Sequence, residues 1–489
     1  MNNKMKAILP IAVAVIIWLW PVPEGLTPNA MRFLGIFLAV ILALILEPLP
    51  NSAVGLIGVT LAGALQLVPL PDGRPAGLGG SLNWVLSGFV DSVVWLIFIA
   101  YMFALGYEKS GLGKRVALIF IKKLGQKALG LGYAAALSDL VLAPFTPSNT
   151  ARSAGTVYPV IKNIPPMYGS LPDKEPRKIG GYVMWTCFAT TCVTSSMFFT
   201  GLAPNLLAVS LIARAPGVTD PAAMTISWMQ WFFSVAPAGI VLFLLVPFIT
   251  YIIYPPTQRI FPETPKWAAD ELEKLGSTTR KEWMMASMGL LALSLWIFGS
   301  SILNATMVGL VVLCLMLILD IINWDDVISN KSAWNTLVWF ATLVAMATGL
   351  ARVGFLAWLG ERVAAQLAGA EMATVVLGLL FVFYFAHYFF ASLTAHTTAL
   401  MPVFLATAAA IPDLNLKLFG MMLAGSLGIM GILTPYATGP APIYYNTGYI
   451  KRVTFWCFGT LYGIIFFSVY AFVAMYWFPV ILGPIVLTP

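Results

Sequence analysis

Two short polar stretches decide the fold of this chain. They read Ser148-Asn149-Thr150-Ala151-Arg152 and Ser392-Leu393-Thr394-Ala395-His396. Both lie among apolar segments, with hydroxyl side chains at the first and third positions and a basic side chain at the fifth. Polar groups at membrane depth are costly and mark substrate or ion paths. A matched pair in the two halves of a chain is typical of a transporter built from internal repeats.

The composition is that of a polytopic membrane protein. Of the 489 residues, 60% are hydrophobic and only 10% are charged, whereas a soluble domain carries about 25% charged residues. About a dozen apolar stretches approach the roughly 20 residues that a membrane-spanning helix needs. They cover approximately residues 7–22, 31–48, 53–70, 92–108, 129–145, 180–200, 232–254, 284–300, 303–322, 335–351, 373–390, 418–433 and 455–478.

Charge and cysteine usage exclude several classes of protein. The net charge of +7 comes from lysines and arginines spread over loops, which is the bias of cytoplasmic loops and not a nucleic-acid surface. The four cysteines lie within predicted spans and have neither metal-site nor disulfide spacing. We therefore expect no metal, no cofactor and no nucleic-acid partner. The basic start of the first span predicts a retained helix whose N-terminus is cytoplasmic.

A polar linker divides the chain into two similar halves. It covers residues 255–283, and its segment 267–275 predicts an amphipathic helix at the membrane surface. We expect an N-terminal helix in 1–28, a first repeat in 29–254 and a second repeat in 284–489. Gly106, Gly111 and Ser148 recur as Gly349, Gly354 and Ser392, at offsets of 243, 243 and 244 residues. These spacings predict a repeat, but they leave its orientation open.

Each half contains a polar tip and a broken helix. The segments after the two polar stretches are short and interrupted by prolines, which predicts re-entrant hairpins near 148–166 and 392–412. Non-helical backbone at membrane depth must be buried in protein or line a wet cavity. Residues 200–205 and 434–440 also look like matching breaks within spanning helices.

These tips have the chemistry of an anion site. Helix N-termini bind anions through free N–H groups and a partial positive charge, and the hydroxyl and amide side chains add donors. If the chain after each tip is helical, Arg152 and His396 lie one turn deeper on the serine's face. Two separated donor clusters suit a small carboxylate that is charged at both ends.

Structural alternatives exist for each of these residues. A Ser-Asn-Thr sequence alone is often a turn or a helix cap. Arg152 could extend to the interface or pair with Asp139. His396 could be a neutral histidine bonded to a backbone carbonyl. His387, the only other histidine, lies in an aromatic run, and we expect it to be a packing residue.

The sequence resembles the divalent anion/sodium symporter family, and within it the bacterial citrate/succinate and tartrate/succinate antiporters. The resemblance covers nearly the whole chain and rests on residues 143–152, 389–396 and 433–440. It implies a homodimer in the bacterial cytoplasmic membrane, with inverted repeats and a transport domain that moves against a scaffold as an elevator. The substrate-binding residues that it implies are Ser148, Asn149, Thr150, Ser392, Leu393, Thr394, Thr434, Pro435, Gly201 and Asn205.

This chain departs from the sodium-coupled members of that family. Those members carry Ser-Asn-Thr in both repeats and a small or hydroxyl residue at the fifth position. Here Leu393 replaces the second asparagine, and Arg152 and His396 stand near the expected sodium positions. Our hypothesis is that fixed positive charge replaces bound sodium. Because an unpaired cation crosses a membrane slowly, the empty carrier would stall.

The predicted function is therefore sodium-independent exchange of a succinate-type C4 dicarboxylate against another dicarboxylate, tartrate or citrate. The alternative is a sodium- or proton-coupled dicarboxylate symporter. A membrane-embedded enzyme would need a catalytic constellation, and the sequence contains no metal-binding His/Glu cluster and no Ser/His/Asp arrangement. Broken helices at one central site also suit occlusion of a substrate better than conduction through a channel.

Overall fold

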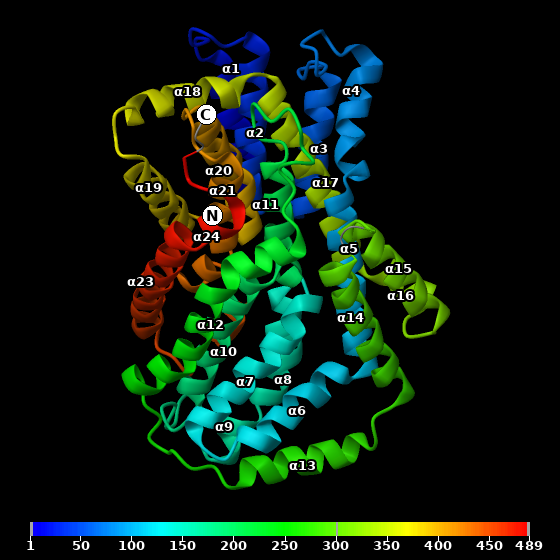
Figure 1. The fold of residues 1–489 in the computed structure, drawn as a ribbon, viewed down its shortest axis with the longest axis vertical. Coiled ribbons are helices and arrows are strands. Elements are labelled where there is room, and N and C mark those ends of the chain that lie inside the picture. The colour runs from blue at the N-terminus through cyan, green and yellow to red at the C-terminus, as the bar shows by residue number, and fades with distance from the viewer. Residues whose placement is uncertain (1–2, 300–301, 487–489) are drawn as a thin grey trace.

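The computed structural model describes residues 3–299 and 302–486 (Figure 1). These residues form helices and three isolated bridges, without a β-strand. Seven helical stretches among them are long and apolar enough to cross a membrane, and shorter apolar helices accompany these. The prediction of an all-helical polytopic membrane protein is confirmed. Each predicted apolar stretch contains a helix.

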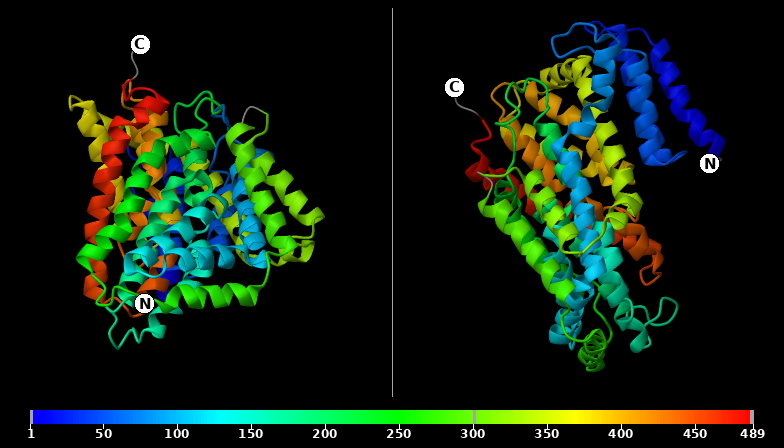
Figure 2. Two further views of the ribbon diagram at one scale, coloured as in Figure 1. Left: turned by 60° about the horizontal axis from the view of Figure 1, so that its bottom comes forward. Right: turned by 90° about the vertical axis from the view of Figure 1, so that its right-hand side faces the viewer.

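The first half of the chain begins with four helices that lie together at one end of the molecule, beside α17 (Figures 1 and 2). The helices of the first half are α1 (Asn3–Leu19), α2 (Pro28–Leu46), α3 (Asn51–Ala64), α4 (Gly77–Leu86), η1 (Ser87–Val90), α5 (Ser92–Ser110), α6 (Leu112–Leu124), α7 (Ala128–Leu142), η2 (Ala143–Phe145), η3 (Thr150–Val157), α8 (Tyr158–Ile161), α9 (Ile164–Met167), α10 (Gly180–Met197), η4 (Phe199–Gly201), α11 (Ala203–Ile212) and α12 (Trp228–Ile253).

The linker and the second half follow the same plan. Their helices are α13 (Glu263–Leu275), α14 (Arg280–Phe298), α15 (Ala305–Ile318), α16 (Trp324–Ser329), α17 (Lys331–Arg352), α18 (Phe355–Leu367), α19 (Met372–Phe385), η5 (Ala386–Phe389), α20 (Leu393–Ala409), α21 (Leu416–Ser426), η6 (Ile429–Ile432), α22 (Pro440–Asn446), α23 (Arg452–Tyr476) and α24 (Phe478–Leu482). The predicted linker helix is α13, and it packs along α6.

Each half contains one helical hairpin, and the two hairpins lie toward opposite ends of the long axis (Figure 1). The sequence placed the hairpins near 148–166 and 392–412, but these residues begin with the return arms only. The outgoing arms are α7 and α19, which hydropathy had presented as ordinary spans. Hairpins at opposite ends are the arrangement that inverted repeats would give, and the inversion stays a prediction.

The two broken helices occur where the sequence predicts them. In the first half α10 stops at Met197, the chain passes through η4, and α11 continues the path. In the second half α21 stops at Ser426, and the non-helical residues 433–439 lead into α22. Both breaks lie beside the hairpin tips, so four interruptions of regular helix occur in one region.

Two matching glycines redirect the chain before each hairpin. Gly111 separates α5 from α6 with φ of 79°, and Gly354 separates α17 from α18 with φ of 83°. Backbone with positive φ favours glycine, because a side chain would be strained there. This explains why the two glycines recur at the repeat offset. The amphipathic helices α6 and α18 that follow them were not predicted as elements.

The buried apolar side chains form two separate clusters. The smaller one joins α2, α3, Trp84 of α4 and the second half of α17. The larger one contains the hairpins and broken helices, with α12 and α23 packed around them, and it reaches α5, α14 and α15. Burial of apolar surface stabilises each cluster. The smaller cluster holds α2–α4 against α17 and also touches the second hairpin, through Ala406 of α20.

Candidate functional site

The first polar tip lies between α7 and η3. The hydroxyl of Ser148 accepts a hydrogen bond from the backbone N–H of Ala151 at 3.2 Å, as an N-cap does. The amide of Asn149 donates to the hydroxyl of Thr438 at 2.8 Å and is buried. The helix that starts at Thr150 is a π-helix, a wide form that is frequent at functional sites. Ser148 and Thr150 remain partly accessible.

Arg152 is fully enclosed in oxygen atoms. Its side chain is 0% exposed, and its Nε lies 3.1 Å from Oδ2 of Asp139. Of the alternatives for this residue, pairing with Asp139 is therefore the one that the structure shows. The guanidinium donates to six oxygens, which belong to Asp139, Thr146, Thr191, Thr194, Ser195 and Gly201. Carboxylate, carbonyl and hydroxyl oxygens are also the ligands of hard cations.

The first broken helix is fastened to this tip. The backbone N–H of Ala203 donates to the carbonyl of Pro147 at 2.8 Å, and the hydroxyl of Thr200 donates to the carbonyl of Pro144 at 2.5 Å. Asn205 donates to the carbonyls of Ser195 and Phe198 and is fully buried. Gly201 and Asn205 therefore hold the two parts of the helix and the tip together. Both residues were predicted as substrate ligands, and that role stays a prediction.

The second polar tip lies between η5 and α20. The hydroxyl of Ser392 accepts from the N–H of Ala395 at 3.4 Å, so it caps α20 as Ser148 caps η3. Leu393 is buried in the apolar core, and Thr394 is 8% exposed. Ser392 keeps partial exposure. The two tips therefore present their serines in the same manner.

His396 follows this tip inside the protein. It is 0% exposed, and neither of its ring nitrogens has a hydrogen-bond partner among the described residues. The expected bond from a buried histidine to a backbone carbonyl exists, but His387 makes it, from Nε2 to the carbonyl of Ala437 at 2.8 Å. His387 was expected to be a packing residue, and its aromatic surroundings concealed this contact.

One loop contacts both hairpins. Within residues 434–439, Ala437 contacts His387 of the second hairpin, and Thr438 bonds to Asn149 of the first. Thr434 and Pro435 are buried at the start of the loop. Gly439 lies directly against the hydroxyl of Thr150, where a larger residue would clash. All predicted site residues thus belong to one connected region, whose centre is this loop.

The sequence did not predict Asp139 and Thr438 as site residues. Asp139 appeared only as an optional partner of Arg152, although a carboxylate within a predicted span is a strong signal by itself. Thr438 lies within the predicted break at 434–440, and its hydroxyl side chain marked it as a candidate. Among the described residues no group of three or more His, Cys, Asp or Glu side chains could hold a metal ion.

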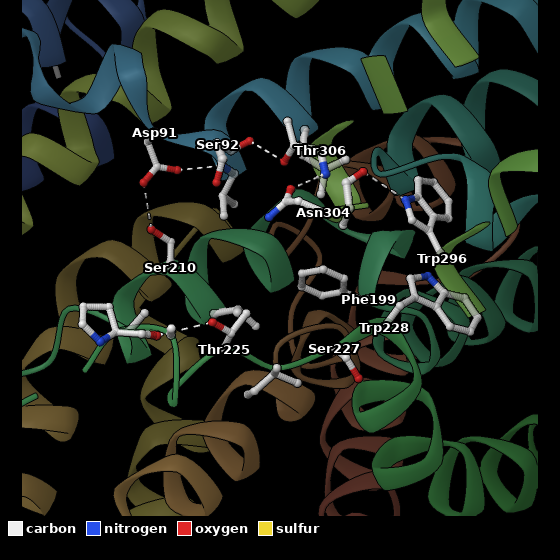
Figure 3. A pocket seen from close by; sticks show the side chains of 18 of the residues that line it. Asp91, Ser92, Phe199, Ser210, Thr225, Ser227, Trp228, Trp296, Asn304 and Thr306 are labelled. Carbon is white, nitrogen blue, oxygen red and sulfur yellow. Dashed lines mark hydrogen bonds between the residues drawn. The ribbon is translucent and has the colours of Figure 1, made fainter. Parts of the chain in front are cut away.

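A cavity of about 570 Å³ opens beside this region (Figure 3). It lies between α5 and α15 on one side and α11 and α12 on the other. Asp91, which caps α5, pairs across the cavity's edge with Arg214, just beyond α11. Phe199 and Trp228 belong to the lining, and Trp228 donates to Thr200 at 3.3 Å. The cavity therefore reaches the first broken helix.

Comparison with known families identifies the chain. The family profile described as the sodium:sulfate symporter transmembrane region matches residues 1–483. The chain belongs to this family. The resemblance to divalent anion/sodium symporters, which rested on the tips and on residues 433–440, is thereby confirmed. The candidate site residues all lie within the region that the family profile matches.

Full-length relatives within the family carry a narrower name. The L-tartrate/succinate antiporter of Escherichia coli O6:K15:H31 (strain 536) is 45% identical over 484 residues, covering 98% of both chains. The proteins of the same name from Escherichia coli K12 and Shigella flexneri are 44% identical over the same length.

Solved structures of more distant proteins share the fold. The YdaH transporter of Alcanivorax borkumensis superposes with a TM-score of 0.55 at 14% sequence identity, covering 92% of this chain and 97% of that one. The antimetabolite efflux pump MtrF of Neisseria gonorrhoeae superposes with a TM-score of 0.54 at 15% identity, covering 88% and 94%. At these identities the likeness concerns the fold alone.

Proposed function

We propose that this chain exchanges a succinate-type C4 dicarboxylate for another dicarboxylate, tartrate or citrate, across the bacterial cytoplasmic membrane and without sodium. The observation that carries the proposal is the loop 434–439, in which Ala437 accepts a hydrogen bond from His387 of the second hairpin and Thr438 accepts one from Asn149 of the first tip. The loop links the second hairpin to the first tip, and donor clusters on both hairpins suit a ligand charged at both ends. The names of the full-length relatives support the substrate class.

The carboxylates bind at the starts of the two return arms. The partly accessible hydroxyls of Ser148, Thr150 and Ser392 lie at these helix starts. The backbone N–H groups of one helix start together add about half an elementary positive charge. Leu393 contributes no side-chain donor and lies in the core, so the second tip binds through its hydroxyls and backbone. One carboxylate at each helix start compensates the partial positive charge of that start.

The surroundings of Arg152 support the proposed sodium independence. Six oxygens that could coordinate a cation are already bonded to its guanidinium. Asp139 compensates the charge of Arg152, so Arg152 alone does not leave an empty carrier charged. The stall of the empty carrier is better attributed to the two helix starts, whose N–H groups lose both water and ligand when the empty site crosses the membrane.

The transport cycle is an elevator motion of one body against another. The moving body contains the hairpins and broken helices with α12 and α23, and the scaffold contains α2–α5 and α14–α17. Support comes from the separate apolar cluster of α2–α4 and α17 and from the cavity between α5 and α11. The Asp91–Arg214 pair crosses this seam. Two copies form a homodimer, as in the family that the sequence resembles.

The N-terminus is cytoplasmic, because Lys4 and Lys6 precede the first span. The end of the molecule that carries α6, α9 and α13 (Figure 1) is rich in basic residues, which cytoplasmic loops favour. Lysines and arginines of these helices and of the loops beside them are Lys114, Arg115, Lys122, Lys123, Lys127, Lys162, Lys174, Arg177, Lys178, Lys266 and Lys274.

Counterflow in proteoliposomes tests the exchange. Labelled succinate is offered outside vesicles that contain succinate, tartrate, citrate or no anion, each in sodium and in choline buffer. We expect uptake only with an internal anion and at equal rates in both buffers. Sodium-driven uptake into empty vesicles would replace the proposal by the symporter alternative.

Cross-linking tests the elevator motion. In a Cys314→Ser/Cys457→Ser background, which removes the exposed thiols, a thiol cross-linker is applied to Asp91→Cys/Arg214→Cys. We expect exchange to fall at least tenfold and to recover on reversal of the cross-link. The matched control is Lys109→Cys/Asp326→Cys, an ion pair within the proposed scaffold, whose cross-link should leave exchange intact. Equal inhibition of both pairs would contradict the assignment of the two bodies.

A further inference from the structure

Arg214 carries a positive charge that the two tips do not use. It lies two residues beyond the end of α11 and lines the cavity of about 570 Å³. Its guanidinium pairs with the carboxylate of Asp91, and its side chain is 33% exposed. Arg152 at the first tip is 0% exposed. Of these two arginines, Arg214 is therefore the one that a ligand can reach from water.

The carboxylate of Asp91 is held in place without the arginine. Its Oδ1 accepts hydrogen bonds from the backbone N–H groups of Val93 and Val94 at 2.8 and 3.1 Å, as the N-cap of α5. Its other oxygen, Oδ2, bonds to Arg214 and to the hydroxyl of Ser210. Because a helix start stabilises a negative charge, Asp91 stays compensated when Arg214 turns away. An ion pair that reaches water also opens at little cost.

Arg214 keeps donors for a second partner. A guanidinium offers five N–H groups in a planar fork that matches a carboxylate. Among the described residues, Arg214 donates from one terminal nitrogen to Asp91 and from the other to Ser210, which lies one turn earlier beside it. Its Nε–H and the second hydrogens of both terminal nitrogens remain free. An incoming carboxylate can therefore bind before Asp91 is released.

The rest of the cavity also favours an anion. Three of the described helices, α5, α12 and α15, begin at its lining, and the caps of the last two are the neutral side chains of Ser227 and Asn304. Each helix start adds about half an elementary positive charge. Oδ1 of Asn304 accepts from the N–H of Thr306 at 2.8 Å, and its amide nitrogen points into the cavity (Figure 3). Among the described lining residues Asp91 is the only acid.

We propose that this cavity is an outer binding site for the dicarboxylate, in which a carboxylate of the substrate displaces Asp91 from Arg214. The inference rests on the proposed function, because it adds a capture step to that transport cycle. Asp91 is an internal competitor, since it is itself a carboxylate and occupies the place that the substrate takes. When the substrate moves on to the tips, Asp91 returns to Arg214, and the guanidinium is paired again.

The outer site lies next to the first tip and toward one membrane face. Trp228 lines the cavity and donates to Thr200, and Thr200 donates to the carbonyl of Pro144, just before the first tip. The loop that follows α11 lies toward the end of the molecule opposite α13 (Figure 1). In the proposed orientation this end is external. The outer site therefore receives substrate from outside the cell.

Opposite changes in KM test this assignment. The KM for external succinate is measured with intact cells loaded with succinate, and the KM at the cytoplasmic face with inverted membrane vesicles. Arg214→Gln removes the cation and should raise the external KM at least tenfold. Asp91→Asn keeps an N-cap and removes the competitor, so it should lower the external KM several-fold. Both shifts should be absent at the cytoplasmic face.

A matched ion pair at the other end of α5 controls for the loss of a charge. Lys109 of α5 pairs with Asp326 of α16, and Lys109→Gln and Asp326→Asn should leave both KM values unchanged. If the pair of Asp91 and Arg214 only joined α5 to α11, both of its variants would shift the external KM in the same direction. That result, or equal shifts at both faces, would overturn the proposal.

Thiol labelling tests the outer site without transport. In the Cys314→Ser/Cys457→Ser background, Thr225→Cys places an exposed thiol at the cavity. An anionic methanethiosulfonate should react faster than a cationic one, and this ratio should rise in Asp91→Asn and fall in Arg214→Gln. Succinate should slow the labelling, except in Arg214→Gln.

The labelling and the transport assay separate the two proposals. If succinate protected the thiol in this pattern but the wild type exchanged no dicarboxylate, the proposed function would be refuted and the outer site would stand. If exchange occurred while labelling ignored both succinate and the two charge variants, the outer site alone would be refuted.

Discussion

Arg152 and His396 hold equivalent places in the two tips, but their surroundings are opposite. The guanidinium of Arg152 makes six hydrogen bonds and pairs with Asp139. His396 has no hydrogen bond among the described residues and is surrounded by aromatic rings. The first tip thus contains a permanent charge with a permanent counter-charge, whereas the imidazole of the second has neither a counter-charge nor a hydrogen-bond partner among the described residues.

This difference shows how a repeated motif can divide two tasks. A saturated cation in an oxygen cage fixes the geometry of the first hairpin against the first broken helix. The imidazole of His396 instead packs against aromatic rings and leaves both of its nitrogens without a hydrogen bond among the described residues. The two tips are similar in sequence, and the fifth residue decides whether a tip is held by hydrogen bonds or by aromatic packing.

The largest effect that we expect comes from removing the guanidinium of Arg152 from the cage, by which we mean the six oxygens that bind it. Arg152→Ser leaves the carboxylate of Asp139 buried without a cation, and removal of one partner of a buried pair costs about 3–5 kcal/mol. Exchange should be lost, and the melting temperature in detergent should fall. Because the oxygens of the cage are then free, sodium chloride should raise the melting temperature of this variant more than choline chloride does, with no such difference in the wild type.

A double variant controls this experiment. Arg152→Ser/Asp139→Asn removes both charges, so most of the stability should return and the sodium effect should disappear. If Arg152→Ser melted like the wild type, or if sodium stabilised single and double variants equally, the cage would not be the cation-like site that the contacts describe.

Asn149 and Leu393 occupy the second positions of the two tips, and each can be replaced by the residue of the other tip. Asn149→Leu copies the second tip into the first and removes the bond to Thr438, which leaves a buried hydroxyl and costs about 1–3 kcal/mol. We expect succinate exchange to fall at least tenfold. Leu393→Asn instead buries an amide in the apolar core and should lower the melting temperature more than the KM for succinate. Identical consequences at the two tips would remove the asymmetry proposed here.

Substitution of the two tip serines, Ser148 and Ser392, should have the smallest effects on stability and KM, and the two effects should be similar. Ser148 and Ser392 cap their return arms through similar bonds, of 3.2 and 3.4 Å. Ser148→Ala and Ser392→Ala should each cost about 1 kcal/mol of stability and raise the KM for succinate by a similar factor of several-fold. A large effect at one serine only would show that the substrate binds mainly at one tip.

Much of the fold follows from apolar length and proline positions. Every predicted stretch contains a helix, yet hydropathy could not distinguish a helix that spans from one that turns back, and α7 and α19 were therefore taken for spans. The helices α6 and α18 are amphipathic and lie beside other helices, so they lack the apolar length of a span. The recurrence of Gly111 as Gly354 was visible, but its cause, a positive φ, was not.

The sequence predicts where the two tips of the candidate site lie, but it does not predict which residues contact them. The hydroxyls and the basic fifth residues are local features of sequence, and their repetition makes them stand out. The partner of Arg152 lies thirteen residues earlier on the opposite arm, and only the hairpin brings it close. His387 was hidden because an aromatic run predicts packing, whereas its role depends on Ala437, fifty residues later.

The cavity at the seam between α5 and α11 has a consequence for the solvent. Its volume of about 570 Å³ corresponds to on the order of twenty water molecules at roughly 30 Å³ each. A motion that closes this space must release those molecules, and its reversal must take them up again. Water activity therefore favours one direction of the motion and opposes the other. Large neutral osmolytes that cannot enter the cavity should therefore shift the balance between its two conformations without touching the substrate site.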